Sequence, residues 1–314
     1  MTPQVTVGGR ERPAEDGAPA LADFTRQLLA SSVLSPSGVD GVWVRSATFE
    51  RITEAVQRSV TALGRGRYET LQAPPVIARA TLERAGYVRC FTDLVGSVHV
   101  FRGSDQQHAD LLRRCDAGTD WTAVLDPADV MLSSAACHHV YPMCAGRLPS
   151  GGRHLEVRGE CFRHEPSHQV TRHRSFRMHE LVYVGEPEEA RAHRDTGLAE
   201  GLELLSTLGL TVEATAANDP FFGRAGAILA DGQRQHAAKY EGVAPVGGLP
   251  TAVMSANYAA EHFGAAFAID TASGSVAHSS CVAFGLDRVA LALLSTHGLD
   301  VDRWPSGVRQ RLWR

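Results

Sequence analysis

The segment from residue 154 to 186 reads HLEVRGECFRHE (154–165), then a loop (166–175), then FRMHELVYVGE (176–186). Both runs have the composition of extended strands, so the segment predicts two strands joined by a charged loop. Its charged side chains are mostly basic: Arg158, Arg163, His164, Glu165, His168, Arg172, His173, Arg174 and Arg177. Arginine forks match phosphate oxygens, so this hairpin would suit a triphosphate, with Glu165 accepting a donor such as an exocyclic amine. A solvated hairpin tip is the alternative for an isolated basic loop.

The pattern on either side of this hairpin predicts an α+β fold, an antiparallel sheet flanked by helices. Regular alternation of strand and helix, typical of doubly wound parallel sheets, is missing from the sequence. The predicted helices are 47–63, 76–87, 186–210 and 286–298. The predicted strands, besides the hairpin, are 68–76, two around Gly96 within 88–102, and 210–217, 250–258, 265–271 and 275–285. The Pro/Gly/Ala-rich residues 1–20 are interpreted as a flexible leader, and residues 21–314 as one catalytic domain.

Composition limits the classes of function. The 314 residues carry 31 basic and 35 acidic side chains, a formal charge of −4, so no global positive field attracts nucleic acid or an anionic membrane. The chain has no apolar run of membrane-spanning length and begins without a secretory pattern, which predicts a cytoplasmic protein. Six cysteines in such a chain indicate metal ligation or burial rather than disulfides.

The order of residues in the hairpin resembles motif 2 of the class II aminoacyl-tRNA synthetases. CVAFGLDRVALALL (281–294) is similar to motif 3, and the helix and strand ending at Pro74 and Pro75 look like motif 1, the dimer-forming element. The resemblance implies catalytic roles for Arg163 and Arg288, which would contact the ATP phosphates. It also implies ATP contacts by Glu165 to the adenine amine, by Arg172 and His173 to the outer phosphates, and by Phe176 stacked on adenine.

Three soft or acidic residues, Cys137, Glu180 and Cys281, are candidate metal ligands. Their long separations match no zinc-finger spacing, and burial is the better interpretation of lone cysteines from sequence alone. They nevertheless match the Cys, Glu, Cys zinc set of the archaeal-type seryl-tRNA synthetases and their carrier-protein ligase relatives. Three protein ligands leave a fourth position open for a substrate α-amino group. Rival ligands in the sequence are His138, His139, Cys144 and Cys161.

The stretch 218–264 resembles the amino acid:carrier-protein ligases specifically. By this resemblance Lys239 lies near the nucleotide, although a surface lysine is the alternative. The same resemblance places the amino-acid pocket at Met254, Ser255, Ala256 and Asn257, together with Glu180; a buried polar pair is the alternative for Ser255 and Asn257. Arg224, Arg234 and Lys239 are candidates for a basic surface that docks an acidic carrier protein, or simply for solvated surface.

The resemblance implies an enzyme that uses ATP, Mg²⁺ and one Zn²⁺ per chain to activate glycine or alanine as the aminoacyl-adenylate. The amino acid would then pass to the phosphopantetheine thiol of a carrier protein. A homodimer is expected, whereas tRNA and membranes are not expected partners, because the sequence offers neither a tRNA-binding arm nor a polybasic segment. The alternatives are a tRNA ligase served by a separate tRNA-binding chain, a silent nucleotide or amino-acid sensor, and a structural zinc protein.

Overall fold

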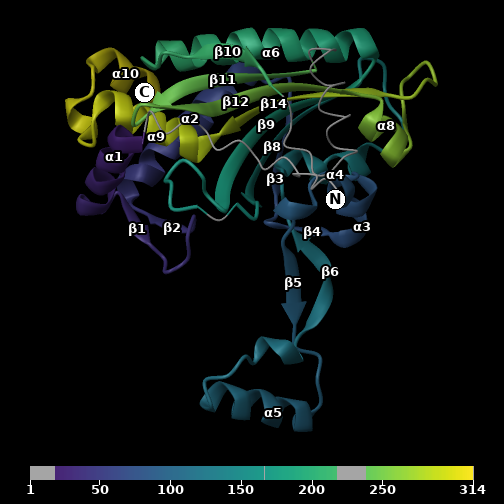
Figure 1. Cartoon of the computed structure of the whole chain (residues 1–314). Helices are drawn as coiled ribbons and strands as arrows, with labels where there is room; N and C mark the ends of the chain where they lie inside the picture. The colour runs from purple at the N-terminus through teal and green to yellow at the C-terminus, as the bar shows by residue number, and fades with distance from the viewer. Residues whose placement is uncertain (1–17, 166, 218–237, 314) are drawn as a thin grey trace, which may run out of the picture.

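The structure, a computed structural model, describes residues 18–165, 167–217 and 238–313. Within these residues, seven strands form the central sheet in the order β10-β11-β12-β14-β9-β8-β3 (Figure 1). These strands are β3 (Glu69–Ala73), β8 (Arg153–Phe162), β9 (Ser175–Gly185), β10 (Glu213–Ala216), β11 (Lys239–Val246), β12 (Leu249–Ala260) and β14 (His278–Gly285). Every neighbouring pair is antiparallel except β3 and β8, which are parallel. The predicted α+β class with an antiparallel sheet is therefore confirmed, with one parallel pair at its edge.

The described residues also form α-helices and short strands outside this sheet. The helices are α1 (Ala18–Ala30), α2 (Ala47–Gly64), α3 (Arg79–Arg84), α4 (Tyr87–Cys90), α5 (Asp105–Asp116), α6 (Pro187–Thr207), α8 (His262–Phe267), α9 (Leu286–His297) and α10 (Ser306–Leu312). The short strands are β1 (Leu34–Pro36), β2 (Trp43–Arg45), β4 (Val76–Ala78), β5 (Ser97–Val100), β6 (Asp126–Leu132), β7 (Gly146–Arg147) and β13 (Ile269–Asp270). Among the described residues, no helix combines the length and the apolar character that crossing a membrane requires.

The two faces of the sheet have different neighbours. Side chains alternate between the faces of a strand, so Val282 and Phe284 of β14 point to one face and Cys281 and Ala283 to the other. The first face packs against α2, α6 and α9 in the larger hydrophobic core. The second face carries a smaller core that contains Cys281 and Ala283. The candidate site residues therefore lie on the face that the three long helices leave open.

Helix α6 lies close against the sheet because two glycines face it (Figure 1). A Cβ atom on Gly197 would lie 2.5 Å from Cγ2 of the fully buried Val282. A Cβ on Gly201 would lie 2.5 Å from Cε of Met254, which is the flexible end of that side chain and can move more easily. The stiff, β-branched Val282 makes Gly197 the position where close packing requires glycine.

Replacing Gly197 by alanine should lower the free energy of unfolding. Overpacking against Val282 costs about 1–3 kcal/mol, and the better helix propensity of alanine returns up to about 1 kcal/mol. The control is Gly307→Ala in α10, where a Cβ would meet nothing within 4 Å, and this variant should be as stable as the wild type or more stable. Urea unfolding of the three proteins measures the difference. An equal loss of unfolding free energy in Gly197→Ala and Gly307→Ala would contradict the role of Gly197 in close packing.

Most predicted elements are confirmed, with three local corrections. Residues 76–78 form β4, so the helix predicted over 76–87 begins only at Arg79. The first of the two strands predicted around Gly96 is instead helical, because Tyr87 and Leu94, seven residues apart, are both buried in a small core with Leu82. Residues 265–267 belong to α8 rather than to a strand.

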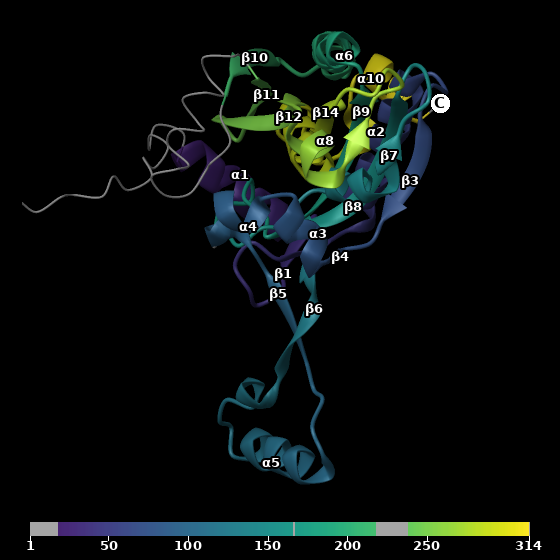
Figure 2. The same cartoon turned by 90° about the vertical axis from the view of Figure 1, so that its right-hand side faces the viewer.

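Several elements were not predicted from the sequence, among them α1, β6 and α5. Helix α1 begins at Ala18, so the last three residues of the predicted leader are helical, and residues 1–17 lie outside the described residues. Strands β5 and β6 form a stem that carries α5 away from the body of the protein (Figures 1 and 2). Helix α5 has no buried residues, and a capping box of Ser104 and Gln107 fixes its start.

Candidate functional site

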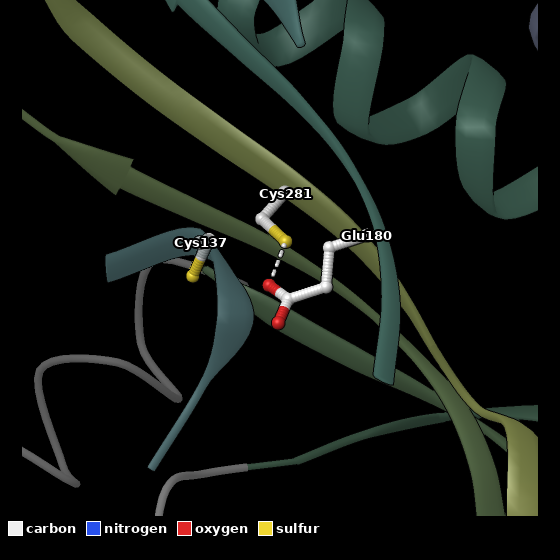
Figure 3. Close-up of side chains that lie close together, drawn as sticks. All are labelled: Cys137, Glu180 and Cys281. Atoms are coloured by element: carbon white, nitrogen blue, oxygen red, sulfur yellow. Dashed lines mark hydrogen bonds between the residues drawn. The ribbon is translucent and has the colours of Figure 1, made fainter. Parts of the chain in front are cut away.

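Three segments bring Cys137, Glu180 and Cys281 together (Figure 3). Cys137 lies in the short 3-10 turn Ala136–His139, Glu180 in β9 and Cys281 in the neighbouring strand β14. One ligand atom from each residue lies within 4.8 Å of the other two, and all three side chains are buried. Cys281 Sγ donates a hydrogen bond to Glu180 Oε2 at 3.1 Å, and the backbone N–H of Ala136 donates to Oε1 at 2.7 Å. Glu180 is thus held facing the two thiols.

The donor set suits a zinc ion. Two sulfurs and one carboxylate oxygen are ligands that Zn²⁺ accepts, and three protein ligands leave one tetrahedral position for a substrate. The hydrogen bond with Cys137, burial and the Glu180 carboxylate raise the pKa of the Cys281 thiol well above its ordinary value. A thiolate would be strongly disfavoured there without a cation, so binding of a metal would release thiol protons.

The rival ligands lie elsewhere. Among the described residues, Cys137, Glu180 and Cys281 are the group of three or more whose ligand atoms converge. His138 and His139 contact Ser134 and Ser133 through their ring nitrogens, at 3.5 and 3.1 Å. Cys144 Sγ lies 3.8 Å from a guanidinium nitrogen of Arg153, and Cys161 is buried in the smaller core. Among the candidates that the sequence offered, geometry therefore favours Cys137, Glu180 and Cys281 as metal ligands.

Arg163 and Phe176 lie together where the loop of the motif 2-like hairpin joins its two strands. The Arg163 guanidinium carbon is 5.2 Å from the centroid of the Phe176 ring, and Arg163 Nε donates to the carbonyl of Ser134 at 3.1 Å. Cys161 and Phe176 are paired residues of β8 and β9, so the ring of Phe176 lies on the same face of the sheet as Glu180. The ring of Phe176 therefore lies on the same strand and face as the candidate metal ligand Glu180, with the Arg163 guanidinium beside it.

Glu165, Arg172 and Arg288 share one electrostatic environment. Arg172 pairs with Glu165 at 3.2 Å across the loop. Arg288, at the start of α9, donates through Nε to the carbonyl of Thr171 at 2.9 Å and through Nη1 to that of Ala252 at 3.2 Å. Burial lowers the pKa of the Arg288 guanidinium, although the Glu165 carboxylate opposes this effect. The loop and α9 thus gather charged groups around one region, as a polyphosphate site requires.

His173, expected by resemblance to contact the outer phosphates, is a buried histidine. Its side chain is only 7% exposed, and burial lowers its pKa to about 4 against the opposing effect of Asp287. The imidazole is therefore neutral at pH 7 and is no cation for an outer phosphate in this structure. Arg172, at 39% side-chain exposure, is the more accessible of the two residues.

His173 should make the folded protein sensitive to acid. The imidazole has a pKa of about 6.5 in the unfolded chain and about 4 in the folded protein, so the unfolded state takes up a proton first as the pH falls. This residue's contribution to stability is complete above pH 6.5 and declines, by up to about 1.4 kcal/mol per pH unit, as the pH falls toward 4. His173→Asn should show a weaker pH dependence in urea unfolding between pH 7 and 5. The same pH dependence of stability in the wild type and in His173→Asn would refute the lowered pKa of His173.

Strand β12 divides the predicted amino-acid pocket between the two faces. Asn257 is paired with Cys281, and Asn257 Nδ2 donates to Ser255 Oγ at 3.1 Å, so these two polar residues share the face of the metal group. Met254 and Ala256 alternate with them and are buried in the larger core beneath the helices. The structure therefore brings Ser255 and Asn257 to the site and places Met254 and Ala256 behind the sheet.

Lys239 is buried, and its Nζ pairs with Glu241 at 3.0 Å. These residues face Asn257 and Ser255 in the register of β11 and β12, so they extend the polar strip toward β11. Burial of Lys239 does not fit the surface-lysine alternative or a role in docking a carrier. The other two docking candidates, Arg224 and Arg234, lie outside the described residues.

Two residues near the site, Tyr141 and Ser134, were not predicted from the sequence. Tyr141 is 1% exposed and stacks on Phe263, with ring centroids 3.9 Å apart and an interplanar angle of 9°. Burial and the nearby Cys137 raise the pKa of the Tyr141 hydroxyl well above its ordinary value. Ser134 acts through its backbone carbonyl, so its role leaves no mark in the residue type. Tyr141 had only one weak signal, its position four residues after Cys137; it begins the next 3-10 turn, Tyr141–Cys144.

Comparison with known proteins identifies the family. The chain is 42% identical over 301 residues to amino acid–[acyl-carrier-protein] ligase 1 of Bradyrhizobium diazoefficiens, which covers 95% of this chain and 92% of that protein. It is 40% identical over 306 residues to ligase 2 of the same organism, covering 96% and 91%. The chain belongs to the amino acid–[acyl-carrier-protein] ligases. No family model matches the chain.

Solved structures show the fold that this ligase shares. M. kandleri SerRS, crystallised in complex with A. aeolicus tRNASec, matches 92% of this chain with a TM-score of 0.78 and 22% sequence identity. The match spans 60% of that longer chain. A second structure, seryl-tRNA synthetase from Pyrococcus horikoshii complexed with ATP, matches 95% of this chain and 62% of that chain at a TM-score of 0.62 and 16% identity. The ligase thus has the catalytic fold of the class II synthetases, as predicted.

Proposed function

We propose that this ligase activates a small amino acid, glycine or alanine, with ATP and transfers it to the phosphopantetheine thiol of a carrier protein. The observation that carries the proposal is the convergence of Cys137, Glu180 and Cys281 on the sheet face that also holds Phe176, in a chain that belongs to the ligase family. An amine site and a nucleotide site on one face would bring the amino-acid carboxylate next to the α-phosphate.

A zinc ion held by Cys137, Glu180 and Cys281 would bind the α-amino group in its open position and so orient the amino acid. Ser255 and Asn257 lie on the same face and would contact the bound amino acid. Tyr141 and its stacking partner Phe263 add bulky aromatic surface near Cys137, which favours a small substrate side chain.

Activation begins when a carboxylate oxygen of the amino acid attacks the α-phosphorus of ATP, and pyrophosphate leaves. Arg163 and Arg288 would neutralise the charge that builds on the phosphate oxygens, together with Mg²⁺. Glu165 would accept from the adenine amine, Phe176 would stack on adenine, and Arg172 and Lys239 would contribute positive charge. These groups bind and orient the nucleotide, and no proton transfer from the chain is needed in this step.

Transfer follows when the thiolate of the carrier's phosphopantetheine arm attacks the carbonyl carbon of the adenylate. A thioester forms, the bond to the phosphate oxygen breaks, and AMP leaves. The thiol proton passes to solvent. We expect the enzyme to act as a homodimer in the cytoplasm, without tRNA.

The test is amino-acid-dependent exchange of labelled pyrophosphate into ATP, run with all twenty amino acids on zinc-loaded protein. Exchange with glycine or alanine supports the proposal, and subsequent labelling of a phosphopantetheinylated carrier protein, but not of total tRNA, completes it. Exchange restricted to serine, with loading of tRNA, would favour a tRNA ligase. Silence with every amino acid would favour a nucleotide or amino-acid sensor.

A further inference from the structure

A short hairpin near the N-terminus lies against the motif 2-like loop. Strands β1 (Leu34–Pro36) and β2 (Trp43–Arg45) pair in antiparallel register and are joined through Gly41. The loop 163–175 carries Glu165 and Arg172, and it returns to the sheet at Ser175. The hairpin and the loop are more than 100 residues apart in the sequence, so their contact belongs to the tertiary structure.

The tip of the hairpin holds the loop through its backbone. The N–H of Arg174 donates to the carbonyl of Gly41 at 2.7 Å, and the N–H of Arg163 donates to the carbonyl of Arg174 at 2.9 Å. Gly41 has a φ of +74°, and a Cβ there would lie 3.1 Å from the carbonyl oxygen of Arg172. A left-handed backbone and close contact with the loop both require glycine at this position.

The side chain of Arg45 joins three separate segments. Its Nη2 donates to the carbonyl of Ser175 at 2.9 Å, where the loop re-enters β9. Its Nη1 pairs with Glu160 of β8 at 3.2 Å, and its Nε pairs with Asp287 of α9 at 2.8 Å. The Arg45 side chain is 14% exposed and that of Asp287 only 1%, so the pair with Asp287 is largely shielded from water.

Asp287 connects this arginine to the nucleotide-binding residues. It immediately precedes Arg288, and it also accepts from the backbone N–H of Arg177 at 2.6 Å and pairs with the Arg177 guanidinium at 2.9 Å. Arg177 immediately follows Phe176. Asp287 therefore fixes α9 to β9 beside both residues, and Arg45 holds Asp287 and the end of the loop at the same time.

We propose that Arg45, with the β1–β2 hairpin, is a positioning element for the nucleotide half of the site, a role that rests on the proposed function. Arg45 sets the spacing between the loop that carries Glu165 and the helix that carries Arg288. Within the described residues, the metal group has partners in the turn segment 136–141, which are Ala136 and Tyr141, and in strands β9 and β14, but none in the hairpin. The hairpin therefore controls nucleotide binding and leaves the metal and amine half unchanged.

Binding of MgATP to Arg45→Met by isothermal titration calorimetry tests this role. Loss of the bridge should weaken MgATP binding by roughly 10- to 100-fold, since small displacements of positioning groups have effects of this size. Zinc content should equal that of the wild type, and the KM for the amino acid should stay within about twofold. Arg45→Lys keeps the charge but not the forked guanidinium, so its MgATP affinity should lie between those of the wild type and Arg45→Met.

Two further variants separate positioning from a general loss of structure. Arg51→Met removes an exposed arginine of α2, paired with Asp302 at 3.6 Å, and should bind MgATP like the wild type. Gly41→Ala should weaken MgATP binding without removing any side-chain charge. Unchanged MgATP affinity in Arg45→Met and Gly41→Ala, or a parallel loss of zinc and nucleotide, would overturn the inference. Failure of the proposed function is distinguishable, because it appears as absence of pyrophosphate exchange in the wild type.

Discussion

Replacing Arg288 by methionine is expected to slow amino-acid-dependent pyrophosphate exchange by about 100- to 1,000-fold, the size typical for loss of one group that stabilises developing charge. Arg288 lies at the start of α9, where its guanidinium is anchored to the carbonyls of Thr171 and Ala252. A side chain held by two backbone carbonyls needs no reorganisation as the α-phosphate gains charge. Methionine fills similar space but offers no donor and no charge.

The measurement is the exchange rate at saturating and at limiting MgATP, so that kcat and KM are obtained separately. We expect kcat to fall more than KM rises, because the charge that Arg288 would stabilise develops mainly in the transition state. Arg303→Met, on an exposed turn after α9, serves as the matched control and should exchange at the wild-type rate. Circular dichroism and urea unfolding confirm that α9 has kept its fold. A rate for Arg288→Met within about threefold of the wild type would refute its proposed role.

The motif residues were within reach of sequence reasoning because each motif is local. Arg163, Glu165, Arg172 and Phe176 lie within fourteen positions of one another, and a strand-loop-strand pattern already places them on one hairpin. The structure shows Glu165 paired with Arg172 and Arg163 beside Phe176. The α+β class was likewise predictable, since the strand and helix patterns span most of the chain.

Which face of the sheet a side chain points to was harder to predict than which motif the residue belongs to. The segment 254–257 was assigned to the amino-acid pocket as a block, but the alternation of a strand sends Met254 and Ala256 into the core under α6 and α9. The resemblance implied a phosphate contact for His173, and the structure shows that its side chain is buried and that burial lowers its pKa. Both differences arise from tertiary packing that residue types do not reveal.

The contacts of Arg45 had no sequence signal at all. Its partners Glu160, Ser175 and Asp287 lie 115, 130 and 242 residues further along the chain. Each partner is an ordinary polar residue, and one of them contributes only a backbone carbonyl. Long-range polar networks of this kind are invisible to periodicity and motif spacing, which compare near neighbours.

Replacing Cys281 by alanine is expected to abolish zinc binding at the proposed site and, with it, amino-acid activation. One of the two thiol ligands disappears, and Cys137 and Glu180 alone cannot complete a site with three protein ligands. We expect zinc content to fall from about one per chain to less than about 0.1, because two remaining ligands bind zinc weakly in competition with water and protons. Pyrophosphate exchange should fall below detection at ordinary amino-acid concentrations.

The control is Cys161→Ala, which removes another buried cysteine on the same face of the sheet, outside the metal group. This variant creates a small cavity and should lose some stability, but it should keep its zinc and its exchange activity. Metal analysis gives the zinc content, and cobalt substitution gives a second readout, because thiolate-to-cobalt absorption should be halved or lost in Cys281→Ala and unchanged in Cys161→Ala. MgATP affinity should be the same in both variants, since none of the proposed nucleotide-binding residues belongs to the metal group. A Cys281→Ala protein with a full complement of zinc would show that the three converging side chains are not the metal site, and equal zinc loss in Cys161→Ala would trace the effect to unfolding of the smaller core.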